Sequence, residues 1–242
     1  MEQRHPISEL TNLDHFKQAI RDIVLGAFDF RSLYLLLTFP QNSPPFLVQE
    51  RSAILHRDIS LHSLMVRYND NGTVHGVLID FDLASVGEPA GEGHHGRWSG
   101  TRRFLATNLL EKETPLYLER FGWESFFYVL CWIGTHYSNG TKIKTDALKT
   151  WDAGDDETLS KVKKLLLIGF DSPLDTLFTD FYKPLYWAWV HGLQSMFHDA
   201  HQAKNEFRRA KAINPEHDTL VFDEETLGGI VTWDRIWKIL KN

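Results

Sequence analysis

The chain has 242 residues, of which 43% are apolar and 13% aromatic, and its formal net charge is −6. This length is sufficient for one domain or two small ones with a real core, and the aromatic content excludes a mainly disordered chain. The acidic balance, without a dense basic run, argues against a nucleic acid or an anionic membrane as the partner.

The same composition argues against membrane insertion and secretion. The longest uninterrupted apolar run, 126–133, has eight residues, whereas a membrane span needs about 20. The first residues contain no apolar stretch that could direct secretion. The single cysteine, Cys131, rules out an internal disulfide and fits a reducing compartment. We therefore expect an intracellular protein, cytoplasmic or nuclear.

The first predicted element is a helix over about 12–25, where apolar residues recur at helical spacing and Thr11 or Asn12 can cap the first turn. The pattern then breaks. An apolar run is followed by three prolines and no clear period, so the sequence predicts an irregular insertion over about 34–52.

A β-hairpin is predicted next, with strands at 64–67 and 74–79 on either side of turn-forming residues at 69–72. Asp58 precedes the first strand, and Asp80 directly follows the second. A loop rich in glycine follows.

The remainder is predicted to be helical, with apolar periodicity over 123–137, 158–168, 184–198 and 233–240. The first of these is apolar nearly all round, which is typical of a central helix with neighbours on every side. The fold class expected is mainly α (α+β), with a small hairpin.

Asp58 and Asp80 are the strongest candidates for chemistry. They are 22 residues apart and bracket a hairpin whose antiparallel strands return the chain close to its start. Each alone could simply cap a turn, but two carboxylates at one site repel each other unless a cation lies between them. A divalent metal carrying phosphates meets this need, with one carboxylate holding Mg²⁺ and the other accepting a proton from an attacking hydroxyl.

The sequence motifs around both aspartates resemble those of a known family. Residues 54–60 (Ile-Leu-His-Arg-Asp-Ile-Ser) resemble the catalytic loop of protein kinases, and 79–84 (Ile-Asp-Phe-Asp-Leu-Ala) resemble their metal-binding segment in the form used by fungal-type protein kinases. Further matches follow in order at 100–106, 124–130 and 226–232. The resemblance extends over nearly the whole chain apart from 34–52.

This resemblance implies a protein-kinase-like C-terminal lobe over 1–242, in which 1–11 is a hinge-like segment and the N-terminal β-lobe is missing. It implies ATP-dependent phosphoryl transfer to Ser or Thr hydroxyls of a protein substrate, with ATP and Mg²⁺ as cofactors.

Site residues follow from the same resemblance. Asp58 is the implied base, with His56 and Arg57 beside it in the catalytic motif and Arg57 anchoring the activation loop. Asp80 is the implied Mg²⁺ ligand. Gly100 and Thr101 are implied to lie where the peptide substrate binds.

Departures from the family pattern predict an incomplete or impaired activity. Ser63 stands where the motif has an asparagine metal ligand, Gly122 where the family has an aspartate that receives backbone N–H groups, and Asn108 where kinases have a glutamate that pairs with an arginine. Only one glycine, Gly26, and one lysine, Lys17, precede Asp58, so the Gly-rich loop and the ATP-binding lysine are lacking.

Two alternatives remain open. The same departures suit a non-catalytic, pseudokinase-type binding module. A small-molecule kinase of the aminoglycoside or choline type shares a similar pair of motifs, and His62 and residues 87–89 resemble its pattern. The matches at 100–106 and 124–130 favour a protein kinase over a small-molecule kinase.

Overall fold

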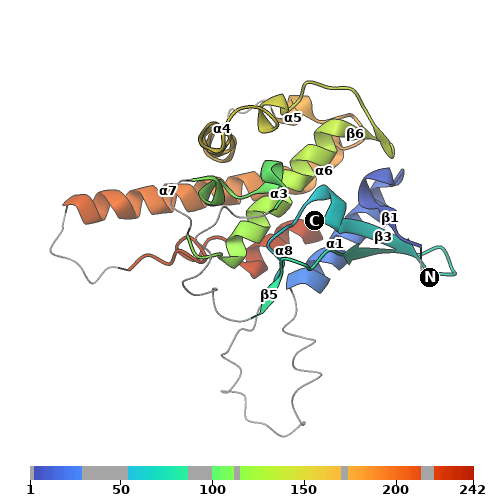
Figure 1. Ribbon diagram of the computed structural model, residues 1–242, viewed down its shortest axis with the longest axis horizontal. Coiled ribbons are helices and arrows are strands. Elements are labelled where there is room, and N and C mark those ends of the chain that lie inside the picture. Colours follow the sequence, from blue (N-terminus) through green and yellow to red (C-terminus); the bar gives the residue numbers. More distant parts are fainter. Residues whose placement is uncertain (1–2, 29–53, 87–99, 112–114, 170–173, 214–220) are drawn as a thin grey trace, which may run out of the picture.

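The computed structural model describes residues 3–28, 54–86, 100–111, 115–169, 174–213 and 221–242. The predicted insertion at 34–52, most of the glycine-rich loop and residues 87–89 lie outside these ranges. The described part is mainly helical with small antiparallel sheets, so the predicted α+β class is confirmed at this level (Figure 1).

Helices make up most of the described chain. In chain order they are α1 Leu13–Phe28, α3 Glu119–His136, α4 Asp156–Ile168, α5 Leu174–Leu177, α6 Lys183–Leu185, the π-helix η7 Tyr186–Val190, α7 His191–Ile213 and α8 Trp233–Lys241. Short 3₁₀ turns lie between them, at η1 Ile7–Glu9, η3 Leu61–Ser63, η4 Arg102–Phe104, η5 Thr107–Leu110 and η6 Lys149–Trp151.

The strands are short and pair antiparallel. They are β1 His5–Pro6, β2 Ile54–Leu55, β3 Leu64–Tyr68, β4 Val74–Leu78, β5 Ser85–Val86, β6 Tyr137–Ser138 and β7 Thr141–Lys142. Strands β1, β3 and β4 form one sheet in that order, while β2 pairs with β5 and β6 with β7. The predicted hairpin is therefore confirmed as β3–β4, and residues 5–6, within the segment predicted to be hinge-like, form the short edge strand β1.

Helix α1 packs directly on β4. Asn12, one of the two predicted caps, begins the helix by accepting the N–H groups of Asp14 and His15 at 2.8 and 3.0 Å. At the contact, a Cβ atom on Gly76 would lie 1.8 Å from the Ala19 carbonyl oxygen. Only glycine lets the strand approach the helix this closely.

Helix α3 crosses the middle of the molecule (Figure 1), and every residue from Arg120 to His136 is buried. Its aromatic rings contact those of three other elements: Phe127 contacts α7, Tyr128 contacts η6 and Trp123 contacts α8. The prediction of a central helix is confirmed, because an all-round apolar surface can be buried only where neighbours lie on every side.

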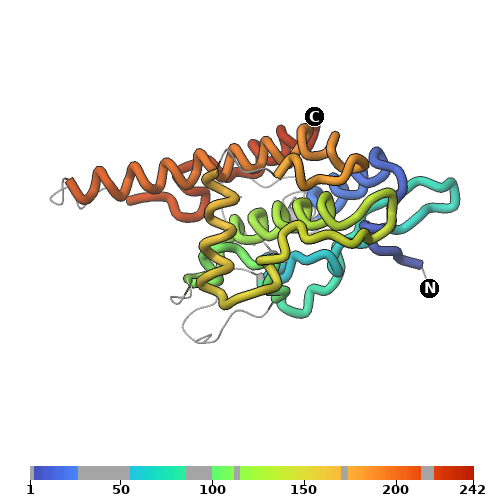
Figure 2. The backbone as a smooth tube through the Cα atoms, turned by 90° about the horizontal axis from the view of Figure 1, so that it is seen from above, coloured from blue at the N-terminus to red at the C-terminus, as the bar shows by residue number. Residues whose placement is uncertain are grey.

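The C-terminal helices differ from the predicted single helix over 184–198. Lys183–Leu185 and the π-helical turn 186–190 lead into α7, which continues to Ile213. Its last buried residue is Ala200, and the turns beyond it extend away from the body of the molecule (Figure 2). The prediction ended early because the apolar stripe ends where the helix leaves the core.

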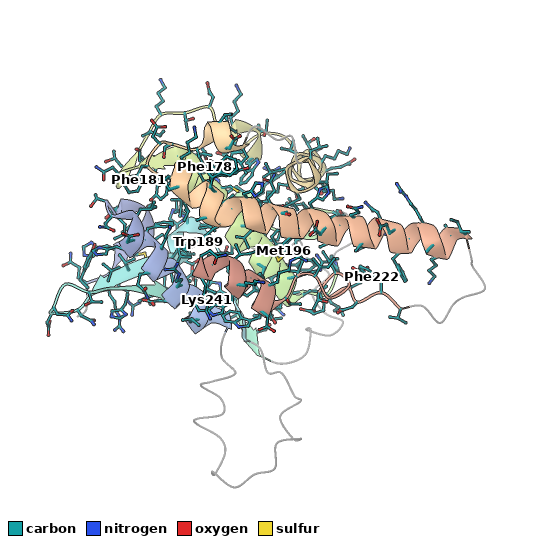
Figure 3. The ribbon with its side chains drawn as sticks, turned by 180° about the vertical axis from the view of Figure 1, so that it is seen from behind. Phe178, Phe181, Trp189, Met196, Phe222 and Lys241 are labelled. Carbon is teal, nitrogen blue, oxygen red and sulfur yellow. The ribbon has the colours of Figure 1, made fainter. Side chains whose placement is uncertain are left out.

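Helix α8 lies beside α7 on the back of the molecule (Figure 3). Thr232 caps it as predicted, accepting the N–H of Arg235 at 3.4 Å, and Arg235 reaches Asp199 of α7 at 2.6 Å. None of the helices in the described ranges has the length and apolar character that a membrane crossing requires.

Candidate functional site

Two antiparallel pairings hold the loops that carry Asp58 and Asp80. On one side, β2 pairs with β5, Ile54 opposite Val86. On the other, β3 pairs with β4, and the ladder continues through a bond of 2.9 Å from the Ile79 N–H to the Ser63 carbonyl. The two loops, 56–63 and 79–84, therefore run between the same two pairings, as the predicted hairpin requires.

His56 joins the two loops. Its buried ring accepts the Asp58 N–H at Nδ1 over 3.3 Å, and the Ile79 carbonyl lies 2.9 Å from Nε2. Because Asp58 N–H is a donor, Nδ1 must be the accepting nitrogen and Nε2 carries the proton. The ring also packs against Phe81 at 4.7 Å. His56 thus contacts the backbone next to both aspartates, which the sequence motif alone did not specify.

Two residues of these loops hold a left-handed backbone. Arg57 has φ 66° and Asp80 has φ 67°. For a residue with a Cβ this conformation costs on the order of 1 kcal/mol and persists only where neighbouring contacts hold it. Such strain is typical of functional loops.

Asp58 is half-buried and faces the predicted substrate segment. Its Oδ1 accepts the backbone N–H of Thr101 at 3.0 Å. A Cβ on Gly100 would lie 3.5 Å from the same oxygen and 3.0 Å from Leu105 Cδ2, at φ +154°. The structure therefore brings Asp58, Gly100 and Thr101 together, and glycine permits the close approach.

The carboxylates of the second loop, Asp80 and Asp82, are exposed. Phe81 between them borders a cavity of about 390 Å³ whose lining includes Arg4, Asp22 and Arg67, a volume in the range of small-molecule pockets.

Ser63 is buried and serves the local turn. Its hydroxyl donates to the Ser60 carbonyl and accepts the Ser60 N–H, both at 3.0 Å. A role as a substitute Mg²⁺ ligand stays a prediction. Within the described ranges, no group of three or more His, Cys, Asp or Glu side chains is assembled around a common point. The exposed Asp80 carboxylate offers the kind of hard oxygen ligand that Mg²⁺ takes.

Arg57 stacks its guanidinium over the ring of Tyr117 at 5.7 Å. Burial raises the pKa of the Tyr117 phenol, the charge of Arg57 opposes this, and the Asp58 carboxylate adds to it. The loop 87–99, part of the activation segment that Arg57 is predicted to anchor, lies outside the described residues.

Glu124 holds the segment that follows Thr101, and the sequence identified it only as part of a motif match. Its buried Oε1 accepts the Thr107 N–H and the Tyr128 hydroxyl, both at 2.7 Å. A carboxylate inside an otherwise apolar helix was the signal available, because such a group is kept only where donors satisfy it.

At Asn108, where the family pattern predicts a glutamate, an arginine donates a hydrogen bond to a neutral amide oxygen instead of forming an ion pair. Asn108 Oδ1 accepts from Arg120 Nη1 at 3.2 Å, while Arg120 finds its carboxylate in Glu224 at 3.8 Å and donates to the Glu224 carbonyl at 2.7 Å. Burial lowers the pKa of Arg120, and Glu124 and Glu224 oppose that shift. Gly122, one turn into α3, is buried and brings no side chain to its position.

One of the two paired loops carries Asp58 and the other carries Asp80 and Asp82, within the two motifs that resemble those of protein kinases. The comparison with known families makes this specific, because residues 47–134 match the family described as fungal protein kinase. The predicted resemblance to fungal-type protein kinases is thus confirmed over a stretch that contains both aspartates, Gly100 and Thr101. No curated protein matches the chain.

Proposed function

We propose that this protein is a kinase-like domain whose site transfers the terminal phosphate of ATP to a Ser or Thr hydroxyl of a protein substrate. The observation that carries the proposal is the link through His56, which ties the Asp58 loop to the Asp80 loop by hydrogen bonds of 3.3 and 2.9 Å. The His56 ring thereby fixes the backbone of the Asp58 loop relative to the backbone of the Asp80 loop.

Asp58 is assigned the role of base. Its Oδ1 is occupied by the Thr101 N–H, so we assign the substrate proton to Oδ2. The bond to Thr101 also keeps the carboxylate from rotating, which favours proton transfer from a hydroxyl held beside Gly100.

Asp80 is assigned as the Mg²⁺ ligand. When bound, the ion neutralises charge on the phosphate oxygens during transfer. This chain's contribution is the exposed carboxylate of Asp80, a residue with a left-handed backbone.

We propose that transfer by this chain is weak. The Ser63 hydroxyl already donates to the Ser60 carbonyl and accepts the Ser60 N–H. It is therefore less available as a second protein ligand for the metal. Lys17, the one lysine before Asp58 in the sequence, lies with its ammonium 6.0 Å from the Trp189 ring centroid, in the helical part of the fold.

The test is phosphate transfer from γ-labelled ATP to a Ser/Thr peptide library by the full chain, with and without Mg²⁺. We expect low, Mg²⁺-dependent transfer that is lost in Asp58→Asn and in Asp80→Asn. Asp70→Asn, at the exposed tip of the β3–β4 hairpin, is the matched control and should leave transfer unchanged. Transfer that survives Asp58→Asn contradicts the assigned base.

A non-catalytic binding module is the second candidate, and the engagement of Ser63 with its own turn is the observation that favours it. It predicts no thermal stabilisation of the chain by Mg²⁺ and ATP together. The kinase proposal predicts stabilisation that Asp80→Asn abolishes, because ligand binding to the folded state alone raises its apparent stability.

A further inference from the structure

Helix α4 presents a polar inner face to the segment that follows Thr101. Asp156, Ser160 and Lys163 recur at helical spacing, so they lie on one side of the helix. Each of them contacts a different point of residues 102–107. A surface helix normally turns such residues to solvent, but Ser160 and Lys163 are buried.

Lys163 makes the central contact. Its side chain is fully buried, and Nζ donates to the Leu105 carbonyl at 2.6 Å. The ammonium also lies 4.0 Å from the centroid of the Tyr128 ring and 5.5 Å from that of Trp151. Burying a cation is costly, so its retention here needs these partners.

Two further contacts join α4 to the same segment, on either side of Leu105. Asp156 Oδ1 accepts Arg102 Nε at 2.7 Å, and the same guanidinium donates to the Gly154 carbonyl at 3.0 Å. Ser160 donates to the Thr107 carbonyl at 3.2 Å.

Titratable groups around Lys163 come from two other elements. Burial lowers the pKa of its ammonium, Glu124 of α3 opposes this shift, Arg102 of η4 adds to it, and Cys131 of α3 opposes it. The side chain is thus fully buried and bonded to the segment, which supports a role in holding the segment rather than one of surface solvation.

On its other side, the same segment is bonded to Asp58 through the Thr101 N–H. We propose that α4 positions residues 100–107 against Asp58, with Lys163 as the positioning residue. That this segment receives substrate rests on the proposed function; the positioning itself does not.

Amide hydrogen exchange of the full chain, measured by NMR without nucleotide, tests the proposal. The Thr101 N–H reports the bond to Asp58, and the Leu130 N–H in the buried centre of α3 reports global unfolding. We expect Lys163→Met to speed exchange at Thr101 by about tenfold relative to Leu130, because the hydrogen bond from Nζ to the Leu105 carbonyl is lost. Lys161→Met, whose lysine is 70% exposed on the same helix, should change neither amide.

Unchanged exchange at Thr101 in folded Lys163→Met overturns the proposal, as does an increase that only matches Leu130. Should Lys163→Met fail to fold, Ser160→Ala and Asp156→Asn must show the same selective increase, and its absence in both equally overturns the proposal. Since no ATP is present, these results are independent of whether the chain transfers phosphate.

Discussion

The buried lysine of α4 leads to a quantitative prediction about stability and pH. Lys163 is fully buried, and burial lowers the pKa of its ammonium to about 7, whereas in the unfolded chain it titrates near its ordinary value of about 10.4. Between these two values the unfolded chain binds a proton that the folded chain does not. The free energy of unfolding must therefore rise with pH across this window and lose the contribution as pH falls toward 7.

The magnitude follows from the two pKa values. Each pH unit over which the proton difference is complete contributes about 1.4 kcal/mol, and half-titration near pH 7 reduces the first unit, so the gain from pH 7 to pH 9 is about 2 kcal/mol. Above pH 9 the buried Cys131 and Tyr128, whose pKa values burial raises, oppose the trend, so the window ends there.

The measurement is urea unfolding followed by tryptophan fluorescence at pH 7, 8 and 9, for the wild type and Lys163→Met. We expect the wild type to gain stability relative to the variant by about 2 kcal/mol over this range. Lys161→Met, from an exposed position, should follow the wild type. Parallel curves for wild type and Lys163→Met refute the reasoning, because they mean that the buried lysine keeps its proton throughout.

Two further predictions concern the elements that hold the site. Gly76→Ala in β4 should cost several kcal/mol of unfolding free energy and lower Tm markedly, since the new Cβ meets the Ala19 carbonyl oxygen of α1 at 1.8 Å. The control is Gly26→Ala in α1, where a new Cβ meets nothing within 4 Å. An equal effect of both substitutions contradicts the close packing of α1 on β4. Asn12→Ala should cost about 1 kcal/mol of unfolding free energy by removing the cap of α1, measured by urea denaturation, with Asn12→Asp retaining most of it; no difference between the two variants argues against the cap.

The proximity of the two aspartate loops could be predicted from the sequence because it depends on local rules. Turn-forming residues at 69–72 fix a hairpin, and antiparallel pairing then returns Ile79 to Ser63. Helix α3 was equally predictable, since an all-round apolar surface allows only a central position. Neither inference needed a long-range contact.

The inner face of α4 could not be predicted in the same way. Asp156, Ser160 and Lys163 have the composition of a solvated helix face, and only the fold reveals that they meet a segment some 50 residues earlier in the chain. The bonds of His56 are similar, because the proton on Nε2 is fixed by a carbonyl and an N–H that the motif does not identify. Polar contacts of this kind leave no periodic signal.

The backbone of the segment 101–107 is held by three ionisable side chains. Asp58 accepts the Thr101 N–H, Lys163 donates to the Leu105 carbonyl and Glu124 accepts the Thr107 N–H. Backbone groups are the same for every residue except proline, so this restraint fixes the path of the segment without depending on most of its side chains. The path of the segment beside Asp58 can therefore stay constant while most of its side chains change. The geometry of the site then depends on backbone contacts, and the selectivity for a bound molecule depends on the side chains.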